Sequence, residues 1–402
     1  MRVVDVRCHV LLDPGFDPSA TSSAQDTIVV EVITDEGLVG IGETDLNAWV
    51  ARACIQAPGT HTMDLGLQQM LIGSDPLDPE ARWRELYRGS AMSGRRGAVV
   101  HALGALDIAL WDICGQARGV PCWKLWGDAA HDVLTPYASL QPEVSSLDEY
   151  RESIQVWARR AVAAGFTAVK LEATFSGPYR HRGIDAPDEA IADVVAAVRR
   201  EVGPEVVIMV DVQYAFDTVD RALETAQRLA EHDVFFLEAP LWPDDLDAYA
   251  QLSRRSPVPI ASGEWLSSEY EHRDLMDLGG VAVDQPDVGR VGGLTPALRI
   301  CALAGERNRL VVPHAWKTGI SVSVAAQLAA ITPHMPFFEF LPDDLCESAL
   351  RKELVDDGIS FRDGRLELPD RPGLGLVLDR DALARFAEAA EAVSRDRAGA
   401  QR

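Results

Sequence analysis

Four short apolar runs between residues 235 and 316 decide the fold of this chain, and each run carries an acidic or imidazole side chain at or near its end. The runs are FFLEAP (235–240) with Glu238, VPIASGEW (258–265) with Glu264, VAVDQPDVGRVGG (281–293) with Asp284 and Asp287, and LVVPHAW (310–316) with His314. Apolar runs of about four to eight residues without alternation are typical of strands buried on both faces of a parallel sheet.

The same pattern continues on both sides of this stretch. The further runs are FTAVKLE with Lys170 and Glu172, VVIMVDV with Asp211, and HMPFFEFL with Glu339. Successive polar landmarks lie between 23 (264 to 287) and 41 (170 to 211) residues apart, which is enough for a strand, a helix and two turns. A barrel of βα units places its chemistry at the C-terminal ends of its strands, so we predict an α/β barrel with a carboxylate-lined mouth.

Composition limits the classes of function. The chain has 402 residues, 47% hydrophobic content and a formal net charge of −24, which argues against nucleic acid as a partner. No run of about 18 apolar residues and no signal-peptide pattern is present, so we expect no membrane span and a cytoplasmic location. The six cysteines form no CxxC pair, which fits reduced thiols in that compartment. A small anionic substrate remains compatible with the charge if the site holds a cation.

The ends of the chain differ from the βα region. Residues 1–127 predict a separate α+β unit, with antiparallel strands at its start and helical periodicity over 46–72 and 76–118. Residues 128–342 carry the barrel pattern, and residues 343–402 are irregular before a final helix that we expect to return to the first unit. The loop at 13–26 is rich in Pro, Gly and Ser, so it is either a mobile cover of the site or a disordered surface connection.

Three acids end consecutive predicted strands, namely Asp211, Glu238 and Glu264. Three neighbouring carboxylates raise one another's pKa unless a cation compensates them, and an all-oxygen donor set suits Mg²⁺. The alternative is a set of unrelated salt-bridged acids. Because three acids in register are rarely accidental, we predict a metal site.

A second pair of residues suggests acid–base chemistry. Asp287 and His314 end the next two strands, and a carboxylate beside an imidazole fixes its tautomer and raises its basicity. Trp316 and Lys317 follow at once and would bring an aromatic ring and a cation to the same rim. A long loop after the second strand, TFSGPYRHRGIDAP, either contacts the tail of a substrate or is a solvated basic loop; its candidates are Arg180, His181 and Arg182.

Together these motifs resemble the mandelate racemase/muconate lactonizing enzyme family of the enolase superfamily. The resemblance also includes ALDIALWDICGQARGVP (105–121), DQPDVGRVGGLT (284–295) and PGLGLVLD (372–379). It implies a modified TIM barrel, (β/α)7β, under an α+β capping domain built from both chain ends. It also implies Mg²⁺, abstraction of the proton α to a carboxylate, and an even-numbered homo-oligomer.

The resemblance assigns a role to each candidate. Asp211, Glu238 and Glu264 become metal ligands and the Asp287–His314 dyad becomes the base. Lys170 becomes a carboxylate or proton-transfer contact, and Glu339 a hydrogen-bond donor to the enolate oxygen, which requires that Glu339 keep its proton. The loop 13–26 and the segment LNAWV (46–50) would cover the site.

One motif departs from the family. Many members carry Lys-x-Lys on the second strand, whereas this chain has Lys170-Leu171-Glu172, so the second lysine is missing. Racemisation needs a proton donor on each face, while one histidine can serve a syn elimination; we therefore favour dehydration of an acid sugar to a 2-keto-3-deoxy acid. The alternatives are a cycloisomerase, a racemase or epimerase, or a non-catalytic carboxylate-binding protein. Glu172 would be a fourth acid near the metal, an acid for a hydroxyl, or a binder of substrate hydroxyls.

Overall fold

The computed structural model describes residues 1–356, 358–359 and 361–400, with side chains described to residue 395. Its centre is an eight-stranded sheet in the order β11-β10-β9-β8-β7-β6-β5-β12, in which every pair is parallel. The strands are β5 (Pro136–Leu140), β6 (Ala168–Glu172), β7 (Val207–Asp211), β8 (Val234–Glu238), β9 (Ile260–Ser262), β10 (Val283–Asp284), β11 (Leu310–Val311) and β12 (Phe338–Phe340).

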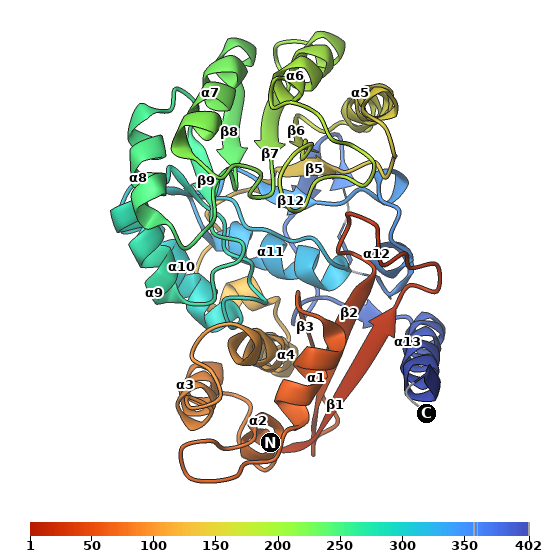
Figure 1. The fold of residues 1–402 in the computed structure, drawn as a ribbon. Coiled ribbons are helices and arrows are strands. Elements are labelled where there is room, and N and C mark those ends of the chain that lie inside the picture. Colours follow the sequence, from red (N-terminus) through yellow and green to blue (C-terminus); the bar gives the residue numbers. More distant parts are fainter. Residues whose placement is uncertain (357, 360, 401–402) are drawn as a thin grey trace.

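One α-helix follows each of the first seven strands and packs on the outside of the sheet (Figure 1). These helices are α5 (Leu147–Ala163), α6 (Glu189–Val202), α7 (Val219–Leu229), α8 (Leu246–Arg255), α9 (Glu269–Asp274), α10 (Leu294–Glu306) and α11 (Gly319–Ile331). Five of them begin at a side-chain cap that accepts a hydrogen bond from the first helical turn: Ser146, Thr218, Asp245, Ser268 and Thr318. The predicted (β/α)7β barrel is therefore confirmed.

The N-terminal region forms a cap of one small sheet and several helices. The sheet is antiparallel, in the order β1 (Val3–Leu12), β2 (Asp26–Thr34) and β3 (Val39–Thr44). Its helices are α1 (Ala48–Gln56), α2 (Leu67–Leu71), α3 (Pro79–Gly89) and α4 (Ala98–Arg118). The periodicity over 46–72 is thus interrupted, because Ala57-Pro58-Gly59 ends the first helix, and the periodicity over 76–118 is interrupted at 90–97.

Helix α4 is the core helix that joins the cap to the barrel. A Cβ at Gly40 or Gly42 of β3 would lie 2.0 or 1.9 Å from a carbonyl oxygen of α4, so only glycine allows this close approach. On its other side, Asp107 accepts hydrogen bonds from the backbone N–H and the hydroxyl of Thr295, at 2.8 and 2.7 Å. By length and composition α4 would suffice to cross a membrane. However, 83% of its most apolar segment is buried inside the protein, as is usual for a helix in a protein core.

The C-terminal segment leaves the barrel and reaches the cap. Its elements are η4 (Asp343–Leu345), α12 (Ala349–Glu353), β13 (Val355–Asp356), β14 (Phe361–Arg362), β15 (Arg365–Glu367), β16 (Val377–Leu378) and α13 (Arg380–Ala400). Helix α13 lies alongside β1 (Figure 1), and Arg380 forms an ion pair of 2.8 Å with Glu31 of β2. The division of the chain at residues 127 and 342 stays a prediction.

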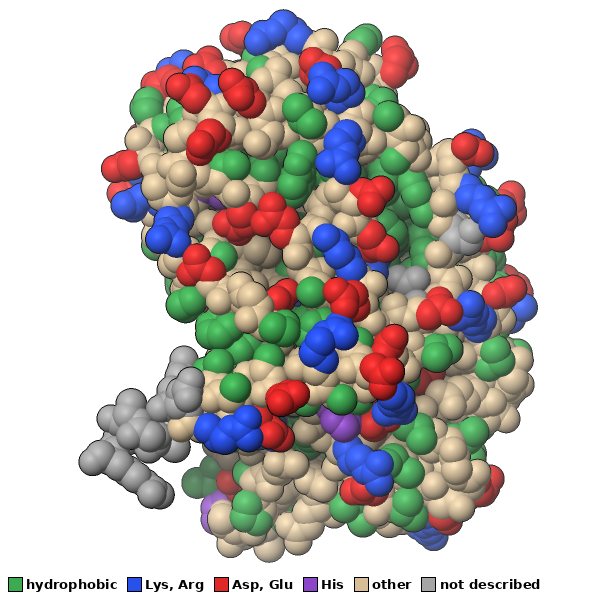
Figure 2. Space-filling view, turned by 90° about the vertical axis from the view of Figure 1, so that its right-hand side faces the viewer, with side chains coloured by type: hydrophobic (Ala, Val, Ile, Leu, Met, Phe, Trp, Pro, Cys, Tyr) green, Lys and Arg blue, Asp and Glu red, His purple; other side chains and the backbone are tan. Residues whose placement is uncertain are grey.

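The net charge of −24 is not gathered in one large patch on the face shown in Figure 2. Acidic and basic side chains are interspersed there between hydrophobic ones.

Candidate active site

Two adjoining cavities lie at the C-terminal ends of the barrel strands. The inner cavity has a volume of about 360 Å³ and the outer cavity about 810 Å³. Both are lined by Ala20, Ser139, Gln141 and Trp316. The inner cavity contains most of the predicted site residues, namely Lys170, Glu172, Arg180, Asp211, Glu264, His314, Trp316 and Glu339.

Strand register brings the acids together as predicted. Glu172 lies beside Asp211, and Asp211 beside Glu238, at the ends of three neighbouring parallel strands. Glu264 follows the next strand by two residues and also lines the inner cavity. Glu238 is 0% exposed and lies beneath the cavity surface. The structure therefore gathers the acids into one buried region.

This region has more negative than positive charge. Burial, followed by repulsion from Glu238, raises the pKa of Asp211 well above its usual value, and burial is also the main cause of the raised pKa of Glu238. Burial and repulsion from Glu143 raise the pKa of Glu172 in the same way, and its Oε1 accepts no hydrogen bond from a described residue. Buried carboxylates with raised pKa values are where a cation would bind most strongly.

Lys170 supplies one compensating charge. Its Nζ lies 3.1 Å from both carboxylate oxygens of Glu238 and 2.8 Å from Oε1 of Glu339. Burial alone would lower its pKa, but the charges of Glu238 and Glu339 outweigh that effect and raise it well above the usual value. The ammonium group is therefore kept charged inside the barrel.

Glu339 does not match its predicted protonation state. Although it is 0% exposed, its carboxylate accepts hydrogen bonds from the Ser139 hydroxyl and the Ala315 N–H, both at 2.7 Å, in addition to the contact with Lys170. Burial opposes ionisation, but Lys170 and then His314 outweigh it and lower the pKa of Glu339 to about 2. The expected hydrogen-bond donor is thus an acceptor, and the nearby proton carrier is Lys170.

The predicted dyad is present. His314 Nδ1 lies 2.8 Å from Oδ2 of Asp287, and His314 Nε2 lies 3.3 Å from Oε2 of Glu264. Burial would lower the pKa of His314, but the charge of Glu264 and the hydrogen bond with Asp287 raise it to about 9. Asp287 thus orients the ring so that Nε2 faces the acids of the site.

Another group of possible ligand atoms lies behind the dyad. Among the described residues, Asp45, Asp287 and His314 form a group whose ligand atoms lie within 4.8 Å of one another; the predicted metal trio is not part of it. Asp45 is already paired with Arg290 at 2.5 Å and with Lys317 at 3.1 Å. Because these two cations neutralise it, this group has little need of a metal ion.

The predicted trio fits a hard divalent cation better. No ion pair to Asp211 is found in the described part of the chain, and its carboxylate accepts a hydrogen bond of 2.8 Å from the backbone N–H of Gln213. Lys170 is shared between Glu238 and Glu339, and His314 lies beside Glu264, so these two groups leave Asp211 without a compensating charge from a described residue. All the donors are carboxylate oxygens, as Mg²⁺ prefers.

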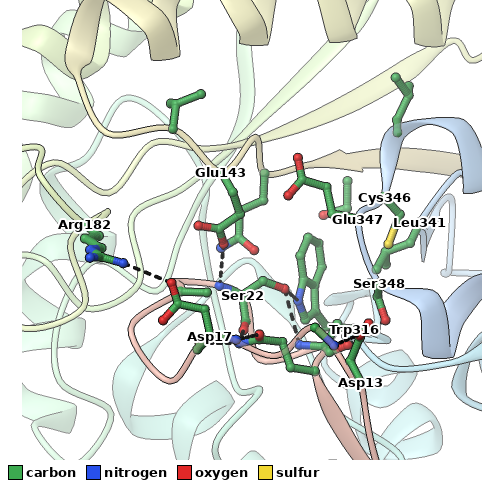
Figure 3. A pocket seen from close by; sticks show the side chains of 18 of the residues that line it. Asp13, Asp17, Ser22, Glu143, Arg182, Trp316, Leu341, Cys346, Glu347 and Ser348 are labelled. Atoms are coloured by element: carbon green, nitrogen blue, oxygen red, sulfur yellow. Dashed lines mark hydrogen bonds and ion pairs between the residues drawn. The ribbon is translucent and has the colours of Figure 1, made fainter. Parts of the chain in front are cut away.

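The loop 13–26 covers the site as predicted. Its residues Ser19, Ala20, Thr21 and Ser23 line the inner cavity. Trp316 Nε1 donates to the Ser22 hydroxyl at 3.2 Å (Figure 3). The segment 46–50 was expected to cover the site too, but it lines neither cavity; α1 turns it toward α13, where Trp49 Nε1 donates to Ser394 Oγ at 2.9 Å.

Lys317 was expected at the rim, but it points into the cap. Its side chain is 3% exposed, and Nζ donates to the carbonyl oxygens of Ser23 at 2.6 Å and Asp26 at 3.1 Å. It therefore fastens the covering loop instead of facing the cavity.

The basic loop after β6 divides into three different environments. Arg180 lines the inner cavity, and Arg182 lines the outer cavity, where it pairs with Asp17 at 3.0 Å. His181, predicted to contact substrate, is 0% exposed, lines neither cavity and packs against the ring of Tyr150. Its Nε2 lies 3.2 Å from the carbonyl oxygen of Glu172, which connects the loop to the end of β6.

Several residues at or beside the site had not been predicted, and four of them contact predicted site residues or line both cavities. Arg290 lines the inner cavity with its side chain 12% exposed, and it donates from its backbone N–H to Asp287 and from Nη1 to the Glu264 carbonyl, at 2.9 and 3.0 Å. Arg290 stands three residues after Asp287 in the run DVGRVGG, and this position could have identified it as a site residue. The other three, which carried no local signal, are Asp45, Ser139 and Gln141.

Comparison with known proteins identifies the family. Residues 4–127 match the mandelate racemase / muconate lactonizing enzyme N-terminal domain, and residues 153–382 match the enolase C-terminal domain-like family. The chain is 31% identical over 398 residues to D-galactarolactone cycloisomerase of Agrobacterium fabrum, covering 96% of this chain and 99% of that protein. It is also 31% identical to L-rhamnonate dehydratase of Saccharopolyspora erythraea, covering 88% and 83% of the two chains.

A solved structure of a related enzyme has the same fold. The L-talarate dehydratase from Polaromonas sp. JS666, complexed with Mg and L-glucarate, superposes with a TM-score of 0.79 and 27% identity, covering 95% of this chain and 96% of the other. With the capped barrel and these matches, the chain belongs to the mandelate racemase/muconate lactonizing enzyme family of the enolase superfamily and is a lyase or isomerase of that family.

Proposed function

We propose that the protein dehydrates an acid sugar, in a Mg²⁺-dependent reaction that begins with removal of the proton α to the carboxylate. The observation that carries this proposal is the presence of the Asp287–His314 dyad, Lys170 and the acid trio around one cavity. A base, a buried cation and a group of carboxylates that can hold a metal ion are what removal of such a weakly acidic proton requires.

The residues divide the chemistry between them. Asp211, Glu238 and Glu264 would hold Mg²⁺, which when bound supplies positive charge to the substrate carboxylate and offsets the effect of Glu264 on the imidazole. His314 Nε2 removes the α-proton, and Asp287 stabilises the imidazolium that forms. Lys170 faces the negative charge that develops as the proton leaves; a charged donor of this kind is worth about 3–4 kcal/mol.

The departing β-hydroxyl needs a proton. His314 can return the one that it removed, in a syn elimination, and Glu172 is a second candidate because its raised pKa favours the protonated form. Loss of the hydroxyl gives an enol that becomes a 2-keto-3-deoxy acid. Glu172 also stands where many family members carry a lysine, which favours elimination over racemisation.

A cycloisomerase is the second candidate. It is supported by the similarity to D-galactarolactone cycloisomerase along 96% of this chain. Opening of a lactone or anhydro ring by elimination would use the same α-proton and the same base, but the leaving oxygen stays attached to the product.

Product analysis tests the proposal. A library of acid sugars and their lactones should be incubated with the enzyme and Mg²⁺ in D₂O. Loss of water with formation of a semicarbazide-reactive keto acid that carries solvent deuterium at C3 supports dehydration, and an isomer of the lactone that differs in mass only by its solvent deuterium supports cycloisomerisation. Binding without product formation and without deuterium incorporation at C2 or C3 would contradict both, and H314N, which keeps the shape of the site, should lose turnover and incorporation.

A further inference from the structure

The outer cavity is strongly acidic. The carboxylates among its lining residues are Asp13, Asp17, Glu143, Glu149 and Glu347. Among the described residues that line it, Arg182 is the basic one, and its guanidinium is turned to Asp17 (Figure 3). It also donates to the Ser19 hydroxyl. The basic group of this cavity is therefore occupied, and the remaining carboxylates have no cation from the lining.

Hydrogen bonds hold two of these acids in place without cancelling their charge. Glu143 accepts from the backbone N–H of Ser22 at 2.8 Å, and Asp13 accepts from the N–H of Gly15 at 2.8 Å and of Ala349 at 3.1 Å. Backbone dipoles stabilise a carboxylate but leave it negative. Each acid still offers free lone pairs, since an ionised carboxylate accepts hydrogen bonds and donates none.

Glu347 extends the negative surface. No hydrogen bond or ion pair to it is found in the described part of the chain, and burial followed by repulsion from Glu143 raises its pKa. Glu143 has the same effect on Glu172 in the inner cavity. Negative potential thus runs from the inner cavity into the outer one.

The two cavities adjoin, because four residues line both of them. The residues they share include Gln141, whose Oε1 is buried and accepts no hydrogen bond from a described residue. The metal trio lies at the ends of β7–β9, whereas the outer cavity lies beyond β5 and β12, where Gln141 and Glu347 follow the strands. A substrate whose carboxylate is held at the trio would therefore extend its tail past Gln141 toward Glu143 and Glu347.

The charge of the residues that line the outer cavity favours one kind of substrate tail over another. Hydroxyl groups donate hydrogen bonds and match the carboxylates of this lining, whereas a second carboxylate would meet five acids and one arginine that is already paired with Asp17. Arg180 does not change this, because it follows β6 and lines the inner cavity only. We propose that the enzyme acts on monocarboxylic acid sugars, whose distal end is an uncharged polyol, in preference to dicarboxylic ones. This inference rests on the proposed function.

Matched substrate pairs test the inference. Gluconate and glucarate, or galactonate and galactarate, share their hydroxyl configuration and differ in whether C6 is a hydroxymethyl group or a carboxylate. Keto-acid formation and deuterium incorporation at C2 or C3 should be measured for a panel of such pairs with Mg²⁺ in D₂O. In each reactive pair we expect kcat/KM to be at least 10-fold higher for the monoacid, with a ratio that falls as salt screens the acids.

A charge reversal connects the preference to the cavity. Glu347→Arg should lower the monoacid-to-diacid ratio at least 10-fold. The matched control is Glu224→Arg, an equal change of charge at an exposed position on α7 outside both cavities, which should leave the ratio unchanged.

The two proposals fail differently. Diacids that react as well as or better than their monoacid partners would overturn the inference and leave the proposed function standing, and so would a ratio that E347R and E224R change equally. Absence of both keto-acid formation and deuterium incorporation at C2 or C3 with every member of the panel would overturn the proposed function and the inference with it.

Discussion

Lys170 Nζ lies 2.8 Å from Oε1 of Glu339, while Ser139 and Ala315 donate to the same carboxylate at 2.7 Å each. This contact makes Lys170 the positive charge in the middle of the site and keeps Glu339 ionised. It follows that the two residues act as a pair, in which Glu339 holds the ammonium in place.

Lys170→Met should abolish most of the activity and also destabilise the fold. The methionine keeps the length of the side chain but leaves Glu238 and Glu339 buried without their cation, and removing one partner of a buried pair costs about 3–5 kcal/mol. We expect kcat to fall on the order of 10²-fold or more. The double variant Lys170→Met/Glu339→Gln should recover part of the thermal stability without recovering activity. Equal stability of the single and double variants would contradict the pairing.

Asp287→Asn should lower kcat on the order of 10²-fold, because the amide no longer stabilises the imidazolium of His314. The chain offers a matched control in a second buried pair, His272 and Asp284, whose atoms are 2.8 Å apart and which lines neither cavity. Asp284→Asn should reduce thermal stability and keep kcat within a few-fold. If both variants lose the same activity, the dyad has no specific role.

Mg²⁺ should stabilise the protein through the predicted trio. A ligand at 100 times its Kd adds about 2.7 kcal/mol to the free energy of unfolding, which is a rise of roughly 2 °C or more in Tm. Asp211→Asn should remove this rise, whereas Asp45→Asn, in the group behind the dyad, should lower Tm but keep the response to Mg²⁺. The opposite pattern would place the ion in the Asp45 group. Differential scanning calorimetry with and without EDTA gives the answer.

Lys317→Met should loosen the loop 13–26, because Lys317 donates to the carbonyl oxygens of Ser23 and Asp26. We expect faster amide exchange and faster proteolysis within 13–26, and a KM that rises more than kcat falls. Lys352→Met, at an exposed lysine of α12, is the control. Unchanged exchange in the loop would show that Lys317 does not fasten it.

Glu31 should make the docking of α13 sensitive to acid. Its hydrogen bond with His9 lowers its pKa, with further help from Arg380, from an ordinary 4.5 to about 2. Because the folded pKa lies below the ordinary one, this contribution to stability is complete above about pH 4.5 and is lost as the pH falls toward 2. Urea midpoints of wild type and Glu31→Gln should therefore differ at pH 6 and converge near pH 2. A difference that is constant across this range would contradict the shift.

The sequence alone determined the barrel and most of the positions of its polar residues. Apolar runs at βα spacing imply parallel strands, and parallel strands place their C-terminal ends at one mouth. Lys170, Asp211, Glu238 and His314 could therefore be located before any contact was known. This succeeds because strand burial and spacing are local properties of the chain.

Only the tertiary structure decided what each side chain faces. Glu339 accepts hydrogen bonds from residues 200 and 24 positions away in the sequence, so its ionised state has no local signature. Arg290 pairs with Asp45 across 245 positions, and that pair has no local signature either. The sequence indicated the region of His181 and Lys317 but not their environment. His181 is buried within the loop that follows β6, and Lys317 points into the cap. The direction of a side chain and its protonation depend on the packing of distant segments around it, and that packing is set by the whole fold.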